Sequence, residues 1–167
     1  MRYLTLGAFV CFVVGVSSAA LAQTADPQMI APINKFMEAF NKGDMAGAAA
    51  THSATADLAI VDEVPPFAWV GAQAFQSWAT ALDADAKKNG MTEAKVTLRA
   101  PTRVETAGTD AYVVVPVVFT FKLKGVAMRE AAQMTFVLRK DASGWMIHGW
   151  TWTGPRPQKV AGGTAAK

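Results

Sequence analysis

The sequence predicts an α+β domain in which three N-terminal helices pack on a curved antiparallel sheet, a cone-shaped arrangement. Two observations lead to this fold class. Up to Gly90 the apolar residues recur mainly at the three- and four-residue spacing of helices, and after Gly90 they alternate as in strands. Short glycine-bearing segments separate the later strands, as hairpins require. The chain has 167 residues, 51% of them hydrophobic, which suffices for one domain with its own core.

The first 22 residues, MRYLTLGAFVCFVVGVSSAALA, have the layout of a secretory signal peptide. An Arg near the start precedes an apolar run, and small residues come before Gln23. The run is shorter than the roughly 18 to 20 apolar residues that span a membrane. We therefore expect cleavage before Gln23 and a periplasmic or secreted protein without a stable membrane anchor. Cys11, the only cysteine, lies in this leader, so the rest of the chain contains no disulfide.

Three helices are expected before the strands begin. Asp26 and the proline after it form an N-cap and a first helical residue for a helix over residues 27–42. Asp44 can cap a short second helix over about residues 45–51. A third helix is expected over residues 71–89, because its apolar residues form one stripe: Phe75, Trp78, Ala79 and Leu82.

Strands are expected in two groups. Residues 58–60 and 67–70, with a break at Pro65-Pro66 between them, are expected to form a short strand pair or a strand and a loop. Four long strands then form an antiparallel meander, at residues 94–106, 111–123, 126–139 and 145–153. The domain is therefore expected over residues 23–154, and residues 155–167, rich in small and polar residues, are expected to form a flexible tail.

The last two strands carry unusual side chains. Alternation divides the last strand into two faces, with Met146, His148, Trp150 and Trp152 on one and Trp145 and Ile147 on the other. Both faces are partly apolar, so the aromatic residues fit a core, a dimer interface or a ligand cage. Glu130 interrupts the apolar face of the preceding strand. If it is buried, it needs a partner or a raised pKa, and at the sheet margin it needs neither.

Two segments point to a known family: residues 36–44, FMEAFNKGD, and residues 60–71, IVDEVPPFAWVG. Together with the order of elements over about residues 28–153, they resemble the nuclear transport factor 2-like superfamily. This superfamily includes ketosteroid isomerases and SnoaL-like polyketide cyclases. The resemblance implies a cone-shaped fold, whereas the chemistry depends on the residues of the site.

The resemblance to the isomerases also implies positions for a general base and for two oxyanion donors. The isomerase base is an Asp on the short strand, nine residues before the glycine that starts the third helix, and Asp62 stands nine residues before Gly71. The donors are a Tyr on the first helix and a protonated Asp on the third long strand, which correspond here to Phe36 and about Phe136. Losing one oxyanion donor lowers the rate by about 10² to 10³, and a phenyl ring donates no hydrogen bond. Isomerisation by the familiar mechanism is therefore not expected.

Asp62 and His52 are the candidate catalytic residues. Asp62 could be a general base in an apolar cavity, with a pKa raised by desolvation. It could also form a water-exposed acidic turn with Glu63 before the two prolines. His52 follows the second helix and could share the cavity with Asp62 in proton transfer, or it could lie on the surface near the helix end.

No metal or cofactor site is predicted. The two histidines, His52 and His148, are far apart in the chain, and the sequence lacks H-x-x-x-H, E-x-x-H and calcium-loop spacings. It also lacks G-x-S-x-G, P-loop and G-x-G-x-x-G motifs. The net charge is only +3 and the basic residues are scattered, which argues against a nucleic-acid partner.

Three functions are compatible with these features. The first is an exported binding module for a small apolar or aromatic molecule, with a conical pocket lined from Phe36, Phe40, Trp69, Phe119 and Phe136. The second is a SnoaL-like isomerase, cyclase or hydratase, with Asp62 as the base and His52 as its partner. The third is a non-catalytic structural dimer, which requires a filled cone and an aromatic interface. A homodimer is expected in any case.

Overall fold

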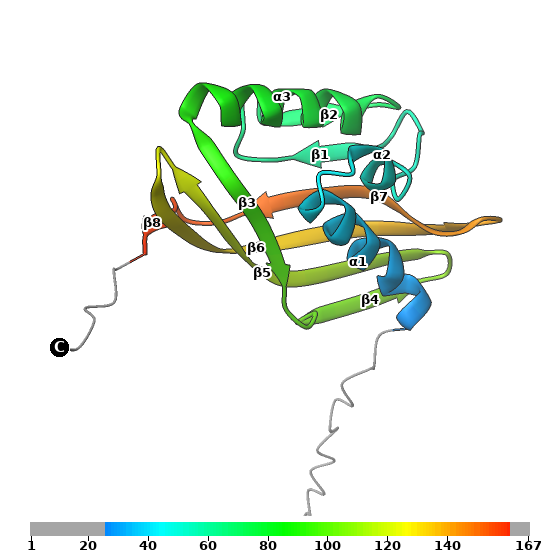
Figure 1. The fold of residues 1–167 in the computed structure, drawn as a ribbon. Coiled ribbons are helices and arrows are strands. Elements are labelled where there is room, and N and C mark those ends of the chain that lie inside the picture. Colours follow the sequence, from blue (N-terminus) through cyan, green and yellow to red (C-terminus); the bar gives the residue numbers. More distant parts are fainter. Residues whose placement is uncertain (1–25, 161–167) are drawn as a thin grey trace, which may run out of the picture.

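The computed structural model describes residues 26–160, in which a curved sheet wraps around helix α1 (Figure 1). The expected leader, residues 1–22, lies outside this part, as do residues 161–167. The elements are α1 (Pro27–Asn41), α2 (Met45–Ala49), β1 (Ala59–Val61), β2 (Ala68–Val70), α3 (Ala74–Asn89), β3 (Met91–Leu98), β4 (Arg103–Ala107), β5 (Asp110–Leu123), β6 (Val126–Asp141), β7 (Gly144–Thr153) and β8 (Gln158–Lys159). This arrangement confirms the α+β fold class.

The three helices form close to where the sequence predicts them. The Asp26 side chain accepts a hydrogen bond from the backbone N–H of Gln28 at 2.9 Å and so caps α1. The Asp44 side chain caps α2 in the same way, through the backbone N–H of Gly47 at 2.8 Å. Helix α3 ends at Gly90, which has a φ of +69°, a left-handed conformation that favours glycine.

The strand order in the sheet is β2-β1-β7-β6-β5-β3, with β4 also on β5 and β8 on β6. Strands β5, β6 and β7 form the expected antiparallel meander. The sheet is nevertheless mixed, because β1 pairs with β7 in parallel. The expectation of a purely antiparallel sheet is therefore wrong at this edge. The chain reaches β7 only after passing through α3 and the other long strands, so the direction of β1 is not set by a hairpin.

The strand expected over residues 94–106 is two strands. Both β3 and β4 pair with β5, and they lie one after the other along the same edge. Residues 99–102 separate them and include Pro101, which has no N–H for a sheet ladder. The prediction therefore identified the correct edge of the sheet but missed the break.

A β-bulge in β7 overturns the expected alternation of its side chains. Leu138 pairs with Ile147, whereas Val137 pairs with Gly149, so His148 is an extra residue in β7. The bulge reverses the alternation, and Ile147 faces the core together with Trp150. Simple alternation had placed these two residues on opposite faces.

The segment that follows β7 is also different from the prediction. In residues 155–160, expected to begin a flexible tail, β8 pairs with Met128 and Arg129 of β6. The backbone N–H of Val160 donates to the carbonyl of Ala127 at 2.9 Å. Strand β7 pairs with β6 only from Gln133 onward, so the earlier part of β6 has backbone groups available for β8.

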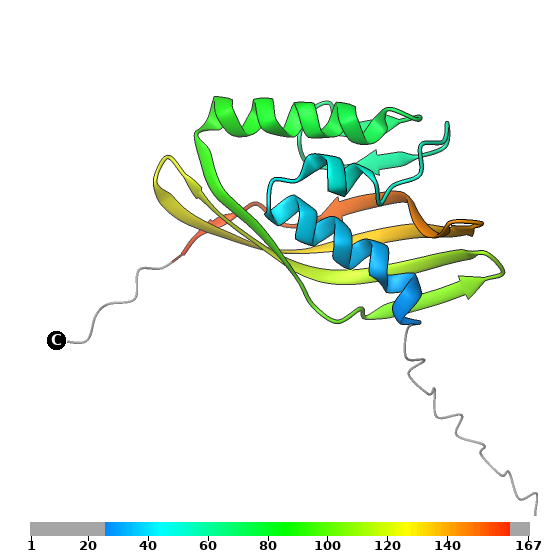
Figure 2. The same ribbon diagram turned by 45° about the vertical axis from the view of Figure 1, so that its right-hand side comes forward.

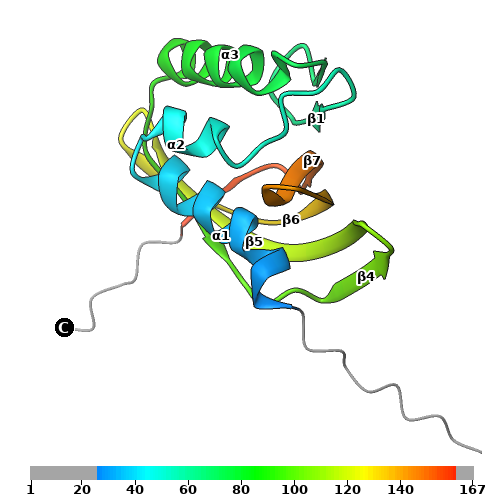
Figure 3. The same cartoon turned by 90° about the vertical axis from the view of Figure 1, so that its right-hand side faces the viewer.

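The helices cover the concave side of the sheet. Helix α1 lies inside the curve and contacts both β7 and β3, and α3 lies across the end of this layer beside β1 and β2 (Figures 1 and 2). Figure 3, which looks along the sheet, shows α1, α2 and α3 on the same side of it. The core lies between these layers and includes Ile33, Phe136, Leu138 and Ile147, each 0% exposed.

Candidate functional site

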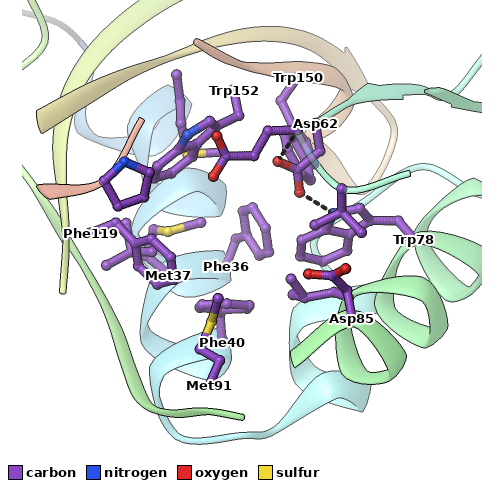
Figure 4. Close-up of a pocket in the computed structure, with 16 residues that line it drawn as sticks. Phe36, Met37, Phe40, Asp62, Trp78, Asp85, Met91, Phe119, Trp150 and Trp152 are labelled. Atoms are coloured by element: carbon purple, nitrogen blue, oxygen red, sulfur yellow. Dashed lines mark hydrogen bonds between the residues drawn. The ribbon is translucent and has the colours of Figure 1, made fainter. Parts of the chain in front are cut away.

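A cavity of about 220 Å³ lies between α1, α3 and the sheet. Its wall is mostly aromatic and aliphatic, and carboxyl groups lie in one part of it. Figure 4 shows Phe36 among the labelled side chains, with Asp62 and Trp78 to one side and Phe119 and Met37 to the other. The lining residues are Phe36, Met37, Phe40, Asp62, Glu63, Val64, Trp78, Leu82, Asp85, Met91, Val96, Phe119, Met134, Trp150, Trp152 and Pro157.

Asp62 lies directly after β1 and reaches the cavity wall. One carboxylate oxygen accepts a hydrogen bond from Trp78 Nε1 at 2.6 Å, and the other accepts one from the backbone N–H of Glu63 at 2.7 Å (Figure 4). Burial raises the pKa of Asp62, although these two hydrogen bonds lower it in part. Asp62 is thus a desolvated, oriented carboxyl group beside a cavity rather than part of a water-exposed turn.

Glu63 and Glu130 form a second acidic group next to Asp62. Glu63 as a whole residue is exposed, but its carboxyl is desolvated, which raises its pKa to about 7, and the charges of Glu130, Asp62 and Asp85 add to the rise. Glu130 is only 1% exposed, and burial raises its pKa as well. Glu130 Oε1 accepts a hydrogen bond from Trp152 Nε1 at 2.9 Å. Glu130 is therefore buried, and does not lie at an open sheet margin.

His52 does not reach the cavity and does not contact Asp62 in this arrangement. Its Nδ1 lies 3.0 Å from the carbonyl oxygen of Ala48, and its Nε2 lies 3.1 Å from Trp150 Nε1. Because the indole can only donate, Nε2 accepts and Nδ1 carries the proton. Burial lowers the pKa of His52 to about 4. The expected pairing with Asp62 is therefore wrong: the ring of Phe36, 4.8 Å from that of His52, lies between His52 and the cavity.

Three of the five predicted pocket residues line the cavity, namely Phe36, Phe40 and Phe119. Trp69 and Phe136 do not, and both are core residues, 8% and 0% exposed. Phe136 pairs with Trp150 across β6 and β7, and the larger indole supplies the cavity surface at that place. The assignment of Trp69 and Phe136 to the pocket is therefore wrong.

The sequence comparisons find no protein-family model that matches the chain, and no curated protein that matches it. Solved structures do match. A nuclear transport factor 2-like superfamily protein from Salmonella enterica serovar Typhimurium is 16% identical, with a TM-score of 0.63, over 84% of this chain and 95% of that chain. The chain has the nuclear transport factor 2-like fold.

Two other solved structures that match are of proteins named after an activity. A ketosteroid isomerase-like protein from Erwinia carotovora atroseptica is 23% identical, with a TM-score of 0.59, over 77% of this chain and 95% of that chain. A hexachlorocyclohexane dehydrochlorinase is 16% identical, with a TM-score of 0.60, over 82% of this chain and 92% of that chain. At these identities, the likeness concerns the fold.

Several residues of the cavity were not predicted as site residues. Trp78 was placed only on the apolar stripe of the third helix, although its N–H holds Asp62. Trp150 and Trp152 line the cavity, but the bulge at His148 made their face unpredictable from alternation. The sequence contained one signal of a polar group near the site, namely Glu130, a carboxyl group on an otherwise apolar face of a strand.

The described residues show no arrangement for a metal ion: within residues 26–160 no three His, Cys, Asp or Glu side chains are grouped to hold one. Within the same part of the chain, none of the helices combines the length and the apolar character needed to cross a bilayer.

Proposed function

We propose that the protein binds a small apolar or aromatic molecule, about one ring in size, in the cavity between α1, α3 and the sheet. The observation that carries this proposal is the cavity of about 220 Å³ with aromatic walls. An apolar protein cavity of about 150 Å³ holds benzene, whereas drug-sized ligands occupy about 300 to 1,000 Å³. A single ring with a short substituent fits this volume, and a steroid does not.

A thermal-shift measurement with toluene and cyclohexanone tests the binding proposal. Any ligand that binds only the folded protein adds about 2.7 kcal/mol of stability at 100 times its Kd. Val96→Phe fills part of the cavity and should abolish the shift, because Val96 lines it and is 6% exposed. The matched control is Val70→Phe, a change of the same size at a residue that is 73% exposed and outside the cavity. Equal shifts in both variants would contradict binding in this cavity.

A second candidate function, proton transfer, is favoured by the position of Asp62. A desolvated carboxylate beside a bound ketone can take a proton from the carbon next to the carbonyl, while the C–H electron pair moves to form an enolate. Return of the proton to a different carbon would complete an isomerisation. Phe36 lines the cavity but Phe136 does not, and neither ring can donate a hydrogen bond to the enolate oxygen. The familiar isomerase mechanism therefore does not apply unchanged.

The second function is tested by incubating cyclohexanone with the protein in D₂O and measuring by NMR how fast deuterium enters the ketone. The exchange needs only the first proton transfer, so it does not depend on knowing the product. We expect Asp62→Asn to lower the exchange rate by about 10² to 10⁴, the usual contribution of a positioned base. Toluene should stabilise wild type and Asp62→Asn alike, which separates loss of the base from loss of the cavity. If wild type shows no exchange above the buffer rate, the proton-transfer function is refuted and only the binding function remains.

Export and dimer formation complete the proposal. Residues 1–22 support export, and mass measurement of the protein from a periplasmic fraction would test cleavage before Gln23.

A homodimer is proposed from the exposed apolar residues Tyr112 and Val137, which pair across β5 and β6, and sedimentation would test it. The purely structural dimer required a filled cone, and the cavity argues against that function.

A further inference from the structure

The carboxyl groups at the cavity have no cationic partner among the described residues, 26–160. Asp62, Glu63 and Asp85 line the cavity, and Glu130 lies behind Glu63. None of the ion pairs within residues 26–160 includes any of these four residues. The charges of the other three all act on Glu63. Glu63 is thus within electrostatic reach of three other acidic groups, although carboxylates that are shielded from water normally pair with a cation or lose their charge.

Glu130 shows that this acidic group is incomplete. The residue is 1% exposed, and its Oε2 has no hydrogen-bond donor in the described part of the chain. Its Oε1 is held by Trp152, so Oε2 is the free end of a fixed carboxyl group. Burial and the nearby charge of Glu130 raise the pKa of Glu63 to about 7, so Glu63 retains a proton in neutral and acidic solution. That proton occupies a place that a cation would otherwise take.

The aromatic rings beside these carboxyl groups fit a cation as well. Trp78 and Trp150 both line the cavity, with their ring centroids 5.0 Å apart and their planes at 86°. Phe119 and Trp152 are arranged in the same way at 5.9 Å and 81°. Aromatic faces attract ammonium groups, most strongly where water is excluded. An anion, in contrast, would meet both the aromatic faces and the carboxylates and would be repelled.

We propose that the ligand of this cavity is a small organic cation, an aromatic or cyclic amine, with its ring against the aromatic wall and its ammonium group against Asp62, Glu63 and Asp85. This inference rests on the proposed binding function and specifies its ligand class. The ammonium group takes the place of the proton that Glu63 carries near neutral pH, so binding releases a proton into the solvent.

Calorimetry with benzylamine, toluene and benzoate tests the cation inference separately from the proposal that the cavity binds an apolar ring. The three probes share one ring and differ in charge. We expect benzylamine to bind more tightly than toluene and benzoate not to bind. Because the pKa of Glu63 is about 7, the Kd of benzylamine should fall about tenfold from pH 6 to pH 8, while that of toluene stays constant. At pH 7 the protein should release about half a proton per benzylamine, measured in buffers of different ionisation enthalpy.

Glu63→Gln should remove both the proton release and the tenfold gain with pH, and should leave toluene binding unchanged. Asp83→Asn is the matched control, because Asp83 lies on the same helix as Asp85 but pairs with Lys87 outside the cavity. It should behave as wild type. Toluene binding without tighter benzylamine binding overturns the cation inference and leaves the cavity proposal standing. If neither toluene nor benzylamine binds, both the cavity proposal and the cation inference are overturned. If Glu63→Gln binds benzylamine with the same pH dependence and proton release as wild type, Glu63 is not the group that loses the proton.

Discussion

Acidification is expected to destabilise the protein through His52, and replacing His52 by Gln should remove this effect. Burial lowers the pKa of His52 from 6.5 to about 4 in the folded state. Below pH 6.5 the unfolded chain therefore binds a proton that the folded protein does not take up until about pH 4. The stability that neutral His52 provides is complete above this window and is lost as the pH falls through it.

The size of the effect follows from these two pKa values. Between pH 7 and pH 5 the loss amounts to about 2 kcal/mol, and it continues to grow until about pH 4. The raised pKa values of Asp62, Glu63 and Glu130 act in the opposite direction, because a carboxyl that is more easily protonated when folded favours the folded state in acid. Wild type alone therefore shows only the sum of these contributions.

A comparison with His52→Gln isolates the histidine. The Gln oxygen can accept the N–H of Trp150 and its amide can donate to Ala48, but Gln does not titrate. Urea unfolding of both proteins, followed by tryptophan fluorescence at pH 7 and pH 5, gives the two free energies of unfolding. Wild type should lose about 2 kcal/mol more than the variant. If both proteins lose the same amount, His52 is not the buried neutral group described above.

Three further substitutions test the packing around the cavity and are checked by urea unfolding at neutral pH. Trp152→Phe keeps an aromatic ring but leaves Glu130 Oε1 without its donor, which should destabilise the fold by about 1–3 kcal/mol, and by less in acid, where Glu130 is neutral. An unchanged stability would show that this hydrogen bond is not needed. Leu138→Ala at a fully buried site should remove about 2–5 kcal/mol, and a loss below 1 kcal/mol would mean that the core closes over the gap. Gly149→Ala would bring a Cβ to 2.8 Å from the carbonyl oxygen of Ala59, so separation of β1 from β7 and a loss of about 1–3 kcal/mol are expected. A tolerated alanine at Gly149 would contradict the close approach of these two strands.

Local patterns were sufficient for the helices and for the order of the long strands. Asp26, Asp44 and Gly90 mark helix ends because capping depends on groups a few residues apart in the chain. The hairpins between β5, β6 and β7 also follow from short glycine-bearing turns. The resemblance then identified Asp62 as a site residue, and the structure places Asp62 at the cavity.

The errors arose where distant segments meet. The pairing of His52 with Asp62 failed because Phe36, from another helix, occupies the space between His52 and the cavity. Trp69 and Phe136 have the same apolar character as Phe119, and only their positions in the layers make them core residues.

The sequence by itself determines the element types, the fold class and the aromatic character of the interior, because each depends on spacing along the chain. Only the tertiary structure decides which of those aromatic residues face empty space. One extra residue at His148 brings Ile147 and Trp150 to the same face of β7, and no periodicity reveals such a bulge. The chemistry of the cavity depends on tertiary contact as well. Glu63 and Glu130 are far apart in the sequence, and the fold brings the charge of Glu130 to bear on Glu63, while no described Lys or Arg pairs with either.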